Sequence, residues 1–369
     1  MMDLVEAFSP SYALARVKFL EAAAAAGLAI SSYEHPLKGR DGEALALDVA
    51  IAGPADAANL LVVSSGCHGV EGYCGSGVQV FALHDKEWAE TAARQGVAVM
   101  YIHALNPYGF SHLRRVTHEN VDLNRNFNDY ALPLPVNEAY REVHAFLLPD
   151  LWPPDAQNAT AIGAYVQHNG IKRFQAAVTQ GQHEFADGLF FGGTAPTWSN
   201  QTVRKLLRRH AASARRLGWI DLHTGLGPSG VGERIFACKE DAAALGRTRQ
   251  WWGGGGSTPV TSFYDGSSAS ARLTGLLMNA AYEECPQAEY TSIAMEYGTL
   301  PIEQTISALR AEQWLHLHPQ ASPELARQIK QQMLDAFYTD TDAWKGQIIS
   351  QARQCLFQAA AGLRGAGGA

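Results

Sequence analysis

The chain has 369 residues, carries a formal net charge of -7, and is 47% hydrophobic. Such a chain can bury a large core, and without a basic run it gives no sign of nucleic-acid binding. No stretch reaches the roughly 20 apolar residues that a membrane span requires. We therefore expect one globular domain over residues 1–369 that binds neither nucleic acid nor a membrane.

Predicted helices and strands alternate along the chain. Helices are expected at 10–26, 74–84, 136–147, 158–179 and 199–216, and the C-terminal part, 301–361, is largely helical. Strands are expected at 60–64, 97–103, 219–222, 234–238 and 292–296. Short apolar strands separated by helices indicate a sheet covered on both faces. The fold predicted is α/β, with three α/β/α layers and a mixed, mostly parallel twisted sheet.

The cysteines are an odd number and lack a CxxC spacing. This pattern does not predict a disulfide framework, so a reducing compartment is expected. The alanine-rich stretch near the N-terminus contains charged residues and has helical periodicity, unlike a signal peptide. We predict a cytoplasmic protein, and the sequence leaves open whether it forms a homo-oligomer. The five cysteines are Cys67, Cys74, Cys238, Cys285 and Cys355.

Four polar segments each follow a predicted strand. They contain His68 and Glu71, Asn124 and Arg125, Asp221 and His223, and Glu296. The carboxyl ends of strands in an α/β sheet form its usual site, so these segments are expected to converge.

His68 and Glu71 are three residues apart in a glycine-rich loop, and an imidazole and a carboxylate at that spacing can reach one ion. His223 follows a strand and can supply the third ligand. Three ligands leave a fourth position for water, as catalytic zinc requires. HxxE alone is a weak pattern, and a single histidine at a strand end is more often structural. Together the three residues predict a site for one Zn²⁺ ion.

Glu296 is the candidate general base. An acid at the end of a buried strand is costly unless it is paired or lies beside a cation. Water activated by a metal needs a carboxylate that accepts its proton and passes it to the leaving amine. Without the histidines, an ion pair with an arginine would be the favoured interpretation of Glu296.

Arginines and one further acid accompany the predicted zinc site. The guanidinium of Arg125 matches a carboxylate or a polarised carbonyl oxygen. Arg114 and Arg115 lie upstream, and for Arg114 an ordinary surface arginine is an equal alternative. Asp221 either orients the zinc-binding histidine or only caps its strand.

In combination these segments resemble the zinc carboxypeptidase superfamily, which includes carboxypeptidase A-like peptidases and the aspartoacylase and succinylglutamate desuccinylase branch. The family pattern is HxxE, NPxG, an arginine, Asn-Arg, a single His after a strand, and a late Glu. The match covers residues 60–300 and is closest to an uncharacterised bacterial branch. The matching residues, in chain order, are His68, Glu71, Asn106, Gly109, Arg114, Arg115, Asn124, Arg125, His223 and Glu296.

The resemblance implies a role for each matching residue. Zinc would be held by His68, Glu71 and His223, and Glu296 would act as base and then acid. Arg115, or Arg114, would polarise the scissile carbonyl. The substrate's terminal carboxylate would be bound by Asn124 and Arg125. The family also has a tyrosine over the substrate between the last ligand and the base, and Tyr264 lies in that interval.

The function predicted is a zinc-dependent hydrolase that cleaves an amide bond next to a free carboxylate. A metallocarboxypeptidase acting on a small peptide is the first hypothesis. An aspartoacylase-like amidohydrolase acting on an N-acyl amino acid is the second. A non-catalytic zinc-binding protein is a third, disfavoured because a pure binder has no use for Glu296.

Overall fold

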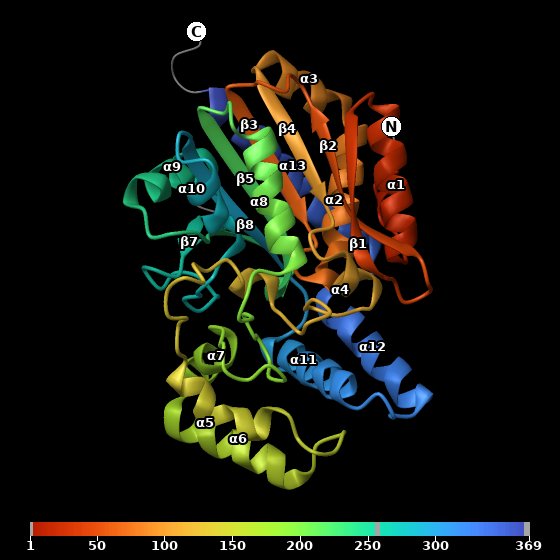
Figure 1. Ribbon diagram of the computed structural model, residues 1–369, viewed down its shortest axis with the longest axis vertical. Coiled ribbons are helices and arrows are strands. Elements are labelled where there is room, and N and C mark those ends of the chain that lie inside the picture. Colours follow the sequence, from red (N-terminus) through yellow and green to blue (C-terminus); the bar gives the residue numbers. More distant parts are fainter. Residues whose placement is uncertain (1–2, 255–258, 365–369) are drawn as a thin grey trace.

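A mixed sheet of eight strands forms the centre of the computed structural model, which describes residues 3–254 and 259–364 (Figure 1). The strand order is β1-β2-β4-β3-β5-β8-β6-β7. The central strands β4, β3, β5 and β8 are parallel, whereas β2 and β6 run antiparallel to their central neighbours. The strands are β1 Ala29–Lys38, β2 Ala44–Ala52, β3 Asn59–Ser65, β4 Val97–His103, β5 Arg216–Ser229, β6 Gly232–Phe236, β7 Val260–Ser262 and β8 Glu289–Gly298.

Helices cover both faces of this sheet, which confirms the predicted three-layer α/β fold. One face carries α2 (Gly72–His84) and α13 (Asp342–Arg364), which contact β3 and β5. Figure 1 shows α8 (Trp198–His210) on the other side of the sheet, where it packs with α10 (Ala280–Glu284). The helix predicted over 199–216 ends at residue 210, because the chain turns there to begin β5.

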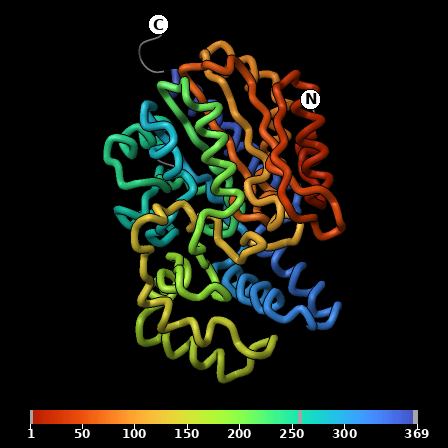
Figure 2. The backbone as a smooth tube through the Cα atoms, viewed as in Figure 1, coloured from red at the N-terminus to blue at the C-terminus, as the bar shows by residue number. Residues whose placement is uncertain are grey.

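A second group of helices lies beyond the carboxyl ends of the central strands (Figures 1 and 2). We call this group the helical cap. It has a hydrophobic core of its own, which includes Tyr140, Phe174 and Leu309. The cap consists of α5 Glu138–Leu147, α6 Ala156–Asn169, α7 Ile171–Thr179, α11 Ile302–Leu317 and α12 Pro323–Phe337.

The boundary between α6 and α7 departs from the predicted single helix 158–179. Gly170 separates the two helices with a φ of 83°, a left-handed conformation that glycine adopts without strain. The chain therefore changes direction inside the cap, and α7 approaches the sheet separately from α6.

The remaining elements are short helices and connections. All five cysteines are buried as free thiols. Among the described residues, no helix combines the length and the apolar character needed to cross a membrane. The other helices are α1 Tyr12–Ala25, α3 Lys86–Arg94, α4 Pro107–Ser111 and α9 Ala242–Trp252, with 3-10 helices η1 Val5–Ala7, η2 Gly69–Glu71, η3 Leu123–Arg125 and η4 Leu277–Asn279.

Candidate functional site

The predicted ligands converge at the carboxyl ends of three adjacent parallel strands. His68 follows β3, and Glu71 ends the 3-10 helix η2 in the same loop. His223 lies on β5, where it is paired in register with Glu296 on β8. Side chains at paired positions point to the same face of a sheet. The sheet register therefore places the candidate base beside the candidate ligands.

The loop after β3 packs directly against the turn formed by the sequence NPYG, residues 106–109. A Cβ atom added to Gly69 would lie 2.1 Å from the carbonyl carbon of Gly109. The amides of Gly69 and Val70 donate to the carbonyl oxygens of Arg115 and Arg114, at 3.0 and 2.9 Å. Glycine at position 69 thus lets the segment that carries Arg115 lie next to the ligand loop.

Three residues, His68, Glu71 and His223, bring their ligand atoms together in a compact triangle. His68 Nδ1 lies 2.8 Å from Glu71 Oε1 and 3.3 Å from His223 Nδ1, and His223 Nδ1 lies 3.0 Å from Glu71 Oε2. Ligands about 2.0–2.2 Å from a tetrahedral zinc ion lie roughly 3.3–3.6 Å apart. The distance between the two imidazole nitrogens falls in this range, and the two distances to Glu71 are about 0.3–0.5 Å shorter, as expected of groups that contact one another directly. Two imidazoles with one carboxylate are a donor set that zinc prefers. The predicted ligands therefore fit one zinc ion.

Each imidazole has a carboxylate next to its Nε2 atom, on the side away from the triangle. His223 Nε2 lies 2.7 Å from Asp221 Oδ2, and the hydroxyl of Ser64 donates to Asp221 Oδ1 at 2.6 Å. His68 Nε2 lies 3.1 Å from Asp122 Oδ1. Each Nδ1 is thereby directed to the centre of the triangle, as is usual for histidines that bind metals. Of the two roles considered for Asp221, the structure places it as the partner of His223.

Asp122 is a site residue that sequence reasoning missed. It stands two residues before Asn124, in a segment singled out only for its amide and guanidinium groups. Burial opposes its charge, but Arg115 and Arg125 hold the pKa of Asp122 well below its usual range. The spacing of an acid just before an Asn-Arg pair was the available signal.

Glu71 and Glu296 are held at opposite ends of the carboxylate pKa range. Burial opposes ionisation of Glu71, yet the adjacent His68 and His223 lower its pKa below the ordinary value. Burial and the negative charge of Glu71 raise the pKa of Glu296 to about 8. A cation held by the triangle would lower the pKa of Glu296, because it attracts the ionised form. Perturbed carboxylates in a pocket are typical of acid–base sites.

The two neighbouring arginines point to different places, which decides between them. Arg115 donates from Nε to Asp122 at 3.0 Å and from Nη1 to Glu71 at 3.3 Å, and it lines the pocket. Arg114 points away from the pocket into a buried cluster with Glu312 and Gln313 of α11. The prediction that left Arg114 as an alternative polarising group is therefore wrong. Of these two arginines, Arg115 lines the pocket and Arg114 does not.

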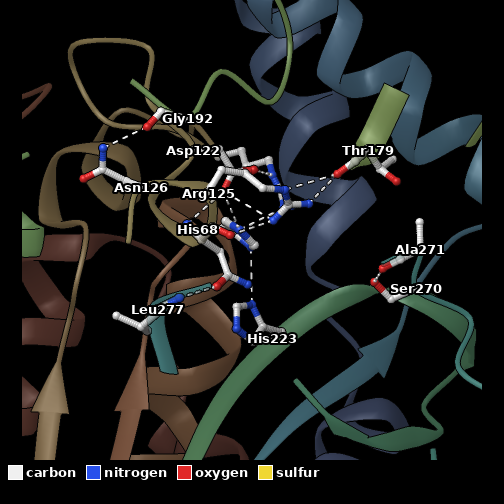
Figure 3. Close-up of polar contacts among 12 residues, drawn as sticks. His68, Asp122, Arg125, Asn126, Thr179, Gly192, His223, Ser270, Ala271 and Leu277 are labelled. Atoms are coloured by element: carbon white, nitrogen blue, oxygen red, sulfur yellow. Dashed lines mark hydrogen bonds and ion pairs between the residues drawn. The ribbon is translucent and has the colours of Figure 1, made fainter. Parts of the chain in front are cut away.

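Arg125 lies beside His68 and His223 (Figure 3), and hydrogen bonds orient both Arg125 and Asn124. Arg125 donates from Nε and Nη2 to the carbonyl oxygen of Thr179, at 3.2 and 2.6 Å, and from Nη1 to that of Asn124, at 2.9 Å. Because a guanidinium carries five hydrogens, each amino nitrogen can offer a second one to a ligand. The amide of Leu277 donates to Asn124 Oδ1 at 2.9 Å, so the Asn124 NH₂ group is the end oriented for donation.

Tyr264 is not among the residues that line the pocket. Its hydroxyl donates to the carbonyl oxygen of Cys238 at 2.7 Å, and its ring lies under Arg272 at 5.1 Å. The preceding residue, Phe263, lines the pocket instead. Phe263 and Tyr264 lie in the turn after β7 with their ring centroids 4.7 Å apart, and of the two only Phe263 reaches the pocket.

The pocket around these residues comprises about 750 Å³ of space, counting its opening to solvent. His68, Arg115, Arg125, His223 and Glu296 contribute its charged or titratable groups. Phe190, another residue not predicted from the sequence, lies under both guanidinium groups, with ring centroids 4.9 Å from Arg115 and 5.6 Å from Arg125. The arrangement can hold an anionic substrate beside a metal ion and a carboxylate base.

The chain belongs to the DUF2817 family, described as a protein of unknown function, whose model matches residues 8–351. No curated protein matches the sequence.

Solved structures give weak similarity. Bovine thrombin-activatable fibrinolysis inhibitor, solved with tick carboxypeptidase inhibitor, is 9% identical, with 95% of this chain and 99% of that chain covered and a TM-score of 0.46. A metallo-carboxypeptidase from Pseudomonas aeruginosa is 12% identical, with 87% and 66% covered and a TM-score of 0.41. One from Burkholderia cenocepacia is 10% identical, with 87% and 66% covered and a TM-score of 0.38. Because all three TM-scores are below 0.5, the fold is taken from the chain's own sheet.

Proposed function

We propose that the protein is a zinc-dependent hydrolase that cleaves an amide bond next to a free carboxylate, acting as a metallocarboxypeptidase on small peptides. The observation that carries this proposal is the triangle of His68, Glu71 and His223 with Glu296 at the paired position of the next strand. A binding site alone would not need a buried carboxylate at this position beside the ligands.

The three triangle residues would hold the zinc ion, and Asp122 and Asp221 would keep their imidazoles in orientation. When bound, zinc would polarise the carbonyl of the substrate and lower the pKa of a water molecule. Glu296 would accept the proton of the attacking water on its carboxylate and deliver it to the departing amine nitrogen. The amide of Leu226 donates to Glu296 Oε1 at 3.1 Å, which fixes the direction of the carboxylate.

The arginines would bind the two oxygen-bearing groups of the substrate. Arg115, adjacent to Glu71 and His68, would donate to the carbonyl oxygen as negative charge develops there. Arg125 and the Asn124 NH₂ group would bind the free carboxylate. Since Arg125 is already oriented by hydrogen bonds to main-chain carbonyls, its side chain has little conformational freedom left to lose on binding.

A second candidate is an N-acyl amino acid amidohydrolase. It is supported by the cap residues that cover the pocket, since such cover suits a substrate with a short acyl group. Both candidates use the same groups, so they differ only in the acyl part of the substrate.

The test combines metal analysis with a base variant. Purified protein should contain about one zinc per chain by elemental analysis and should hydrolyse dipeptides or N-acetyl amino acids. Glu296→Gln should keep its zinc and lose roughly 10²–10⁴-fold in kcat, because proton transfer is removed while the ligands remain. Retained turnover in Glu296→Gln with zinc bound would contradict the assignment of the base.

A further inference from the structure

The helical cap and one loop enclose the pocket from two directions. From the cap, Gln175 and Thr179 of α7 and Phe190 of the following loop line the pocket. The segment 263–273, which follows β7, lines it from the other direction. The chemistry of the zinc site does not require either segment. Their presence therefore points to a role in choosing the substrate.

Hydrogen bonds fasten α7 on both sides of the pocket. The side-chain Nε2 of Gln175 donates to the carbonyl oxygen of Ala269 at 3.0 Å, which ties α7 to the segment 263–273. At the C-terminal end of α7, the carbonyl of Thr179 accepts two hydrogen bonds from Arg125. Figure 3 shows Thr179 and Ser270 on the same side of Arg125 and His223. The cap is thus joined by hydrogen bonds both to the segment 263–273 and to Arg125.

The part of the pocket reached from β6 and β8 is apolar, and we call it the apolar floor. Ile235 on β6 is paired in register with Ala294 on β8, two residues before Glu296 on the same face. Ala237, Phe263 and Leu273 complete this surface. A charged side chain placed here would lose its hydration without gaining a partner, whereas an apolar one would gain by leaving water.

We propose that the cap limits this enzyme to dipeptide-sized substrates whose carboxylate-bearing residue has an apolar side chain, and that it excludes the ends of longer peptides. The proposal rests on the proposed function and specifies its substrate. With the carboxylate on Arg125, the neighbouring side chain can occupy the apolar floor. Because Gln175 lines the pocket and is bonded to Ala269, we expect the acyl part of a longer peptide to meet this bond.

The first experiment measures kcat/KM of the zinc-loaded wild-type protein on a crossed panel. The panel pairs two lengths, an N-acetyl dipeptide and a hexapeptide, with C-terminal Leu, Phe, Asp or Lys. Short substrates ending in Leu or Phe should exceed those ending in Asp or Lys by roughly 10²-fold or more. They should also exceed the matching hexapeptides by roughly tenfold or more.

Each other outcome of the panel overturns a stated part. Equal cleavage of hexapeptides would overturn the size limit, and a preference for Asp or Lys would overturn the role of the apolar floor. Either of these two results would still leave the proposed hydrolase activity in place, because the substrates would be cleaved. Failure to cleave any member would overturn the proposed function together with this inference.

The second experiment opens the cap. Gln175→Ala removes the bond to Ala269 and should raise the ratio of hexapeptide to dipeptide kcat/KM by roughly fivefold, the factor expected for one hydrogen bond. Gln201→Ala is the matched control, because Gln201 is an exposed glutamine on α8 whose Nε2 also donates to a backbone carbonyl, that of Pro196, at 3.0 Å. The control should keep the wild-type ratio. An unchanged ratio in Gln175→Ala would overturn the barrier assigned to this bond.

Discussion

The carboxyl edge of the sheet and the helical cap line the same pocket but contribute different things to it. The sheet edge supplies His68, His223 and Glu296, whose relative positions follow from strand register. The cap supplies an aromatic ring, a helix-end carbonyl and apolar side chains. The side chains proposed for catalysis thus lie on or directly after paired strands, whereas the residues that enclose the pocket belong to helices packed around a separate core.

The largest effect should come from removing a ligand at the sheet edge. His223→Ala should lose stoichiometric zinc and reduce turnover by on the order of 10³-fold or more, since a metal contributes several kcal/mol to catalysis. Elemental analysis and kcat measurements check this. His316→Ala, a change to a cap histidine beside Arg114, should keep its zinc. A wild-type zinc content in His223→Ala would contradict the assignment of His223 as a zinc ligand.

Arg115 lies at the carboxyl ends of the strands, whereas Arg114 is bonded to α11 of the cap. Their variants should therefore differ in how far they affect activity and stability. Arg115→Met should lower kcat by roughly 10²–10³-fold, the loss typical of one donor to a developing oxyanion. Arg114→Met leaves the buried Glu312 with Lys330, at 2.7 Å, as its one remaining ion pair among the described residues. We expect a fall of about 3–5 kcal/mol in the free energy of unfolding for Arg114→Met.

Denaturant unfolding and steady-state kinetics on both variants check this separation. Arg115→Met should lose kcat even in the folded molecule, although it also loses stability because it removes a partner of the buried Asp122 and Glu71. Arg114→Met should keep most of its activity per folded molecule. A large loss of kcat in folded Arg114→Met would show that the cap takes part in the chemistry.

Behind the ligands, a smaller effect is expected. Asp221→Asn keeps the shape of the side chain but removes the charge that faces His223 Nε2 at 2.7 Å. Zinc affinity should fall by roughly 10–100-fold, as is usual when the partner of a ligating histidine is changed. Competition with a chelator measures this. An unchanged affinity would mean that Asp221 only supports the strand, which was its alternative role.

The smallest effect should come from the aromatic ring supplied by the cap. Phe190→Leu keeps an apolar side chain but removes the ring under Arg115 and Arg125. A cation–π contact contributes about 0.5–2 kcal/mol, so KM should rise by less than about 30-fold while zinc content stays the same. Loss of zinc in this variant would instead indicate that the cap holds the ligands in place.

The sheet edge could be predicted from the sequence because its signals are local. The strand over 97–103 was predicted with the bounds that β4 has, and the histidine and carboxylate positions follow apolar strands directly. The first two strands, β1 and β2, were not predicted. Five of the ten residues of β1 are polar or charged, and Pro36 interrupts it, so it lacks the apolar run used to find the other strands.

The cap's contribution could not be predicted, because it depends on contacts between segments far apart in the sequence. Nothing local marks Thr179 as the carbonyl that orients Arg125, or Phe190 as the ring beneath two guanidinium groups. Whether Arg114 or Arg115 faces the pocket also depends on a long-range partner, Glu312. The pattern that selected Tyr264 identified the correct segment, but the residue of that segment that lines the pocket is Phe263.

The cap is built from two stretches of chain, and this bears on the order in which the protein can assemble during synthesis. Helix α11 begins at Ile302, more than 120 residues after α7 ends at Thr179. Apolar residues of α5 and α7, such as Val143 and Phe174, share their core with Leu309 and Phe337. During synthesis, the apolar residues of α5 and α7 therefore stay exposed until α11 and α12 have left the ribosome. The pocket is therefore completed late, and a nascent chain stalled before α11 would carry its ligands without a closed substrate site.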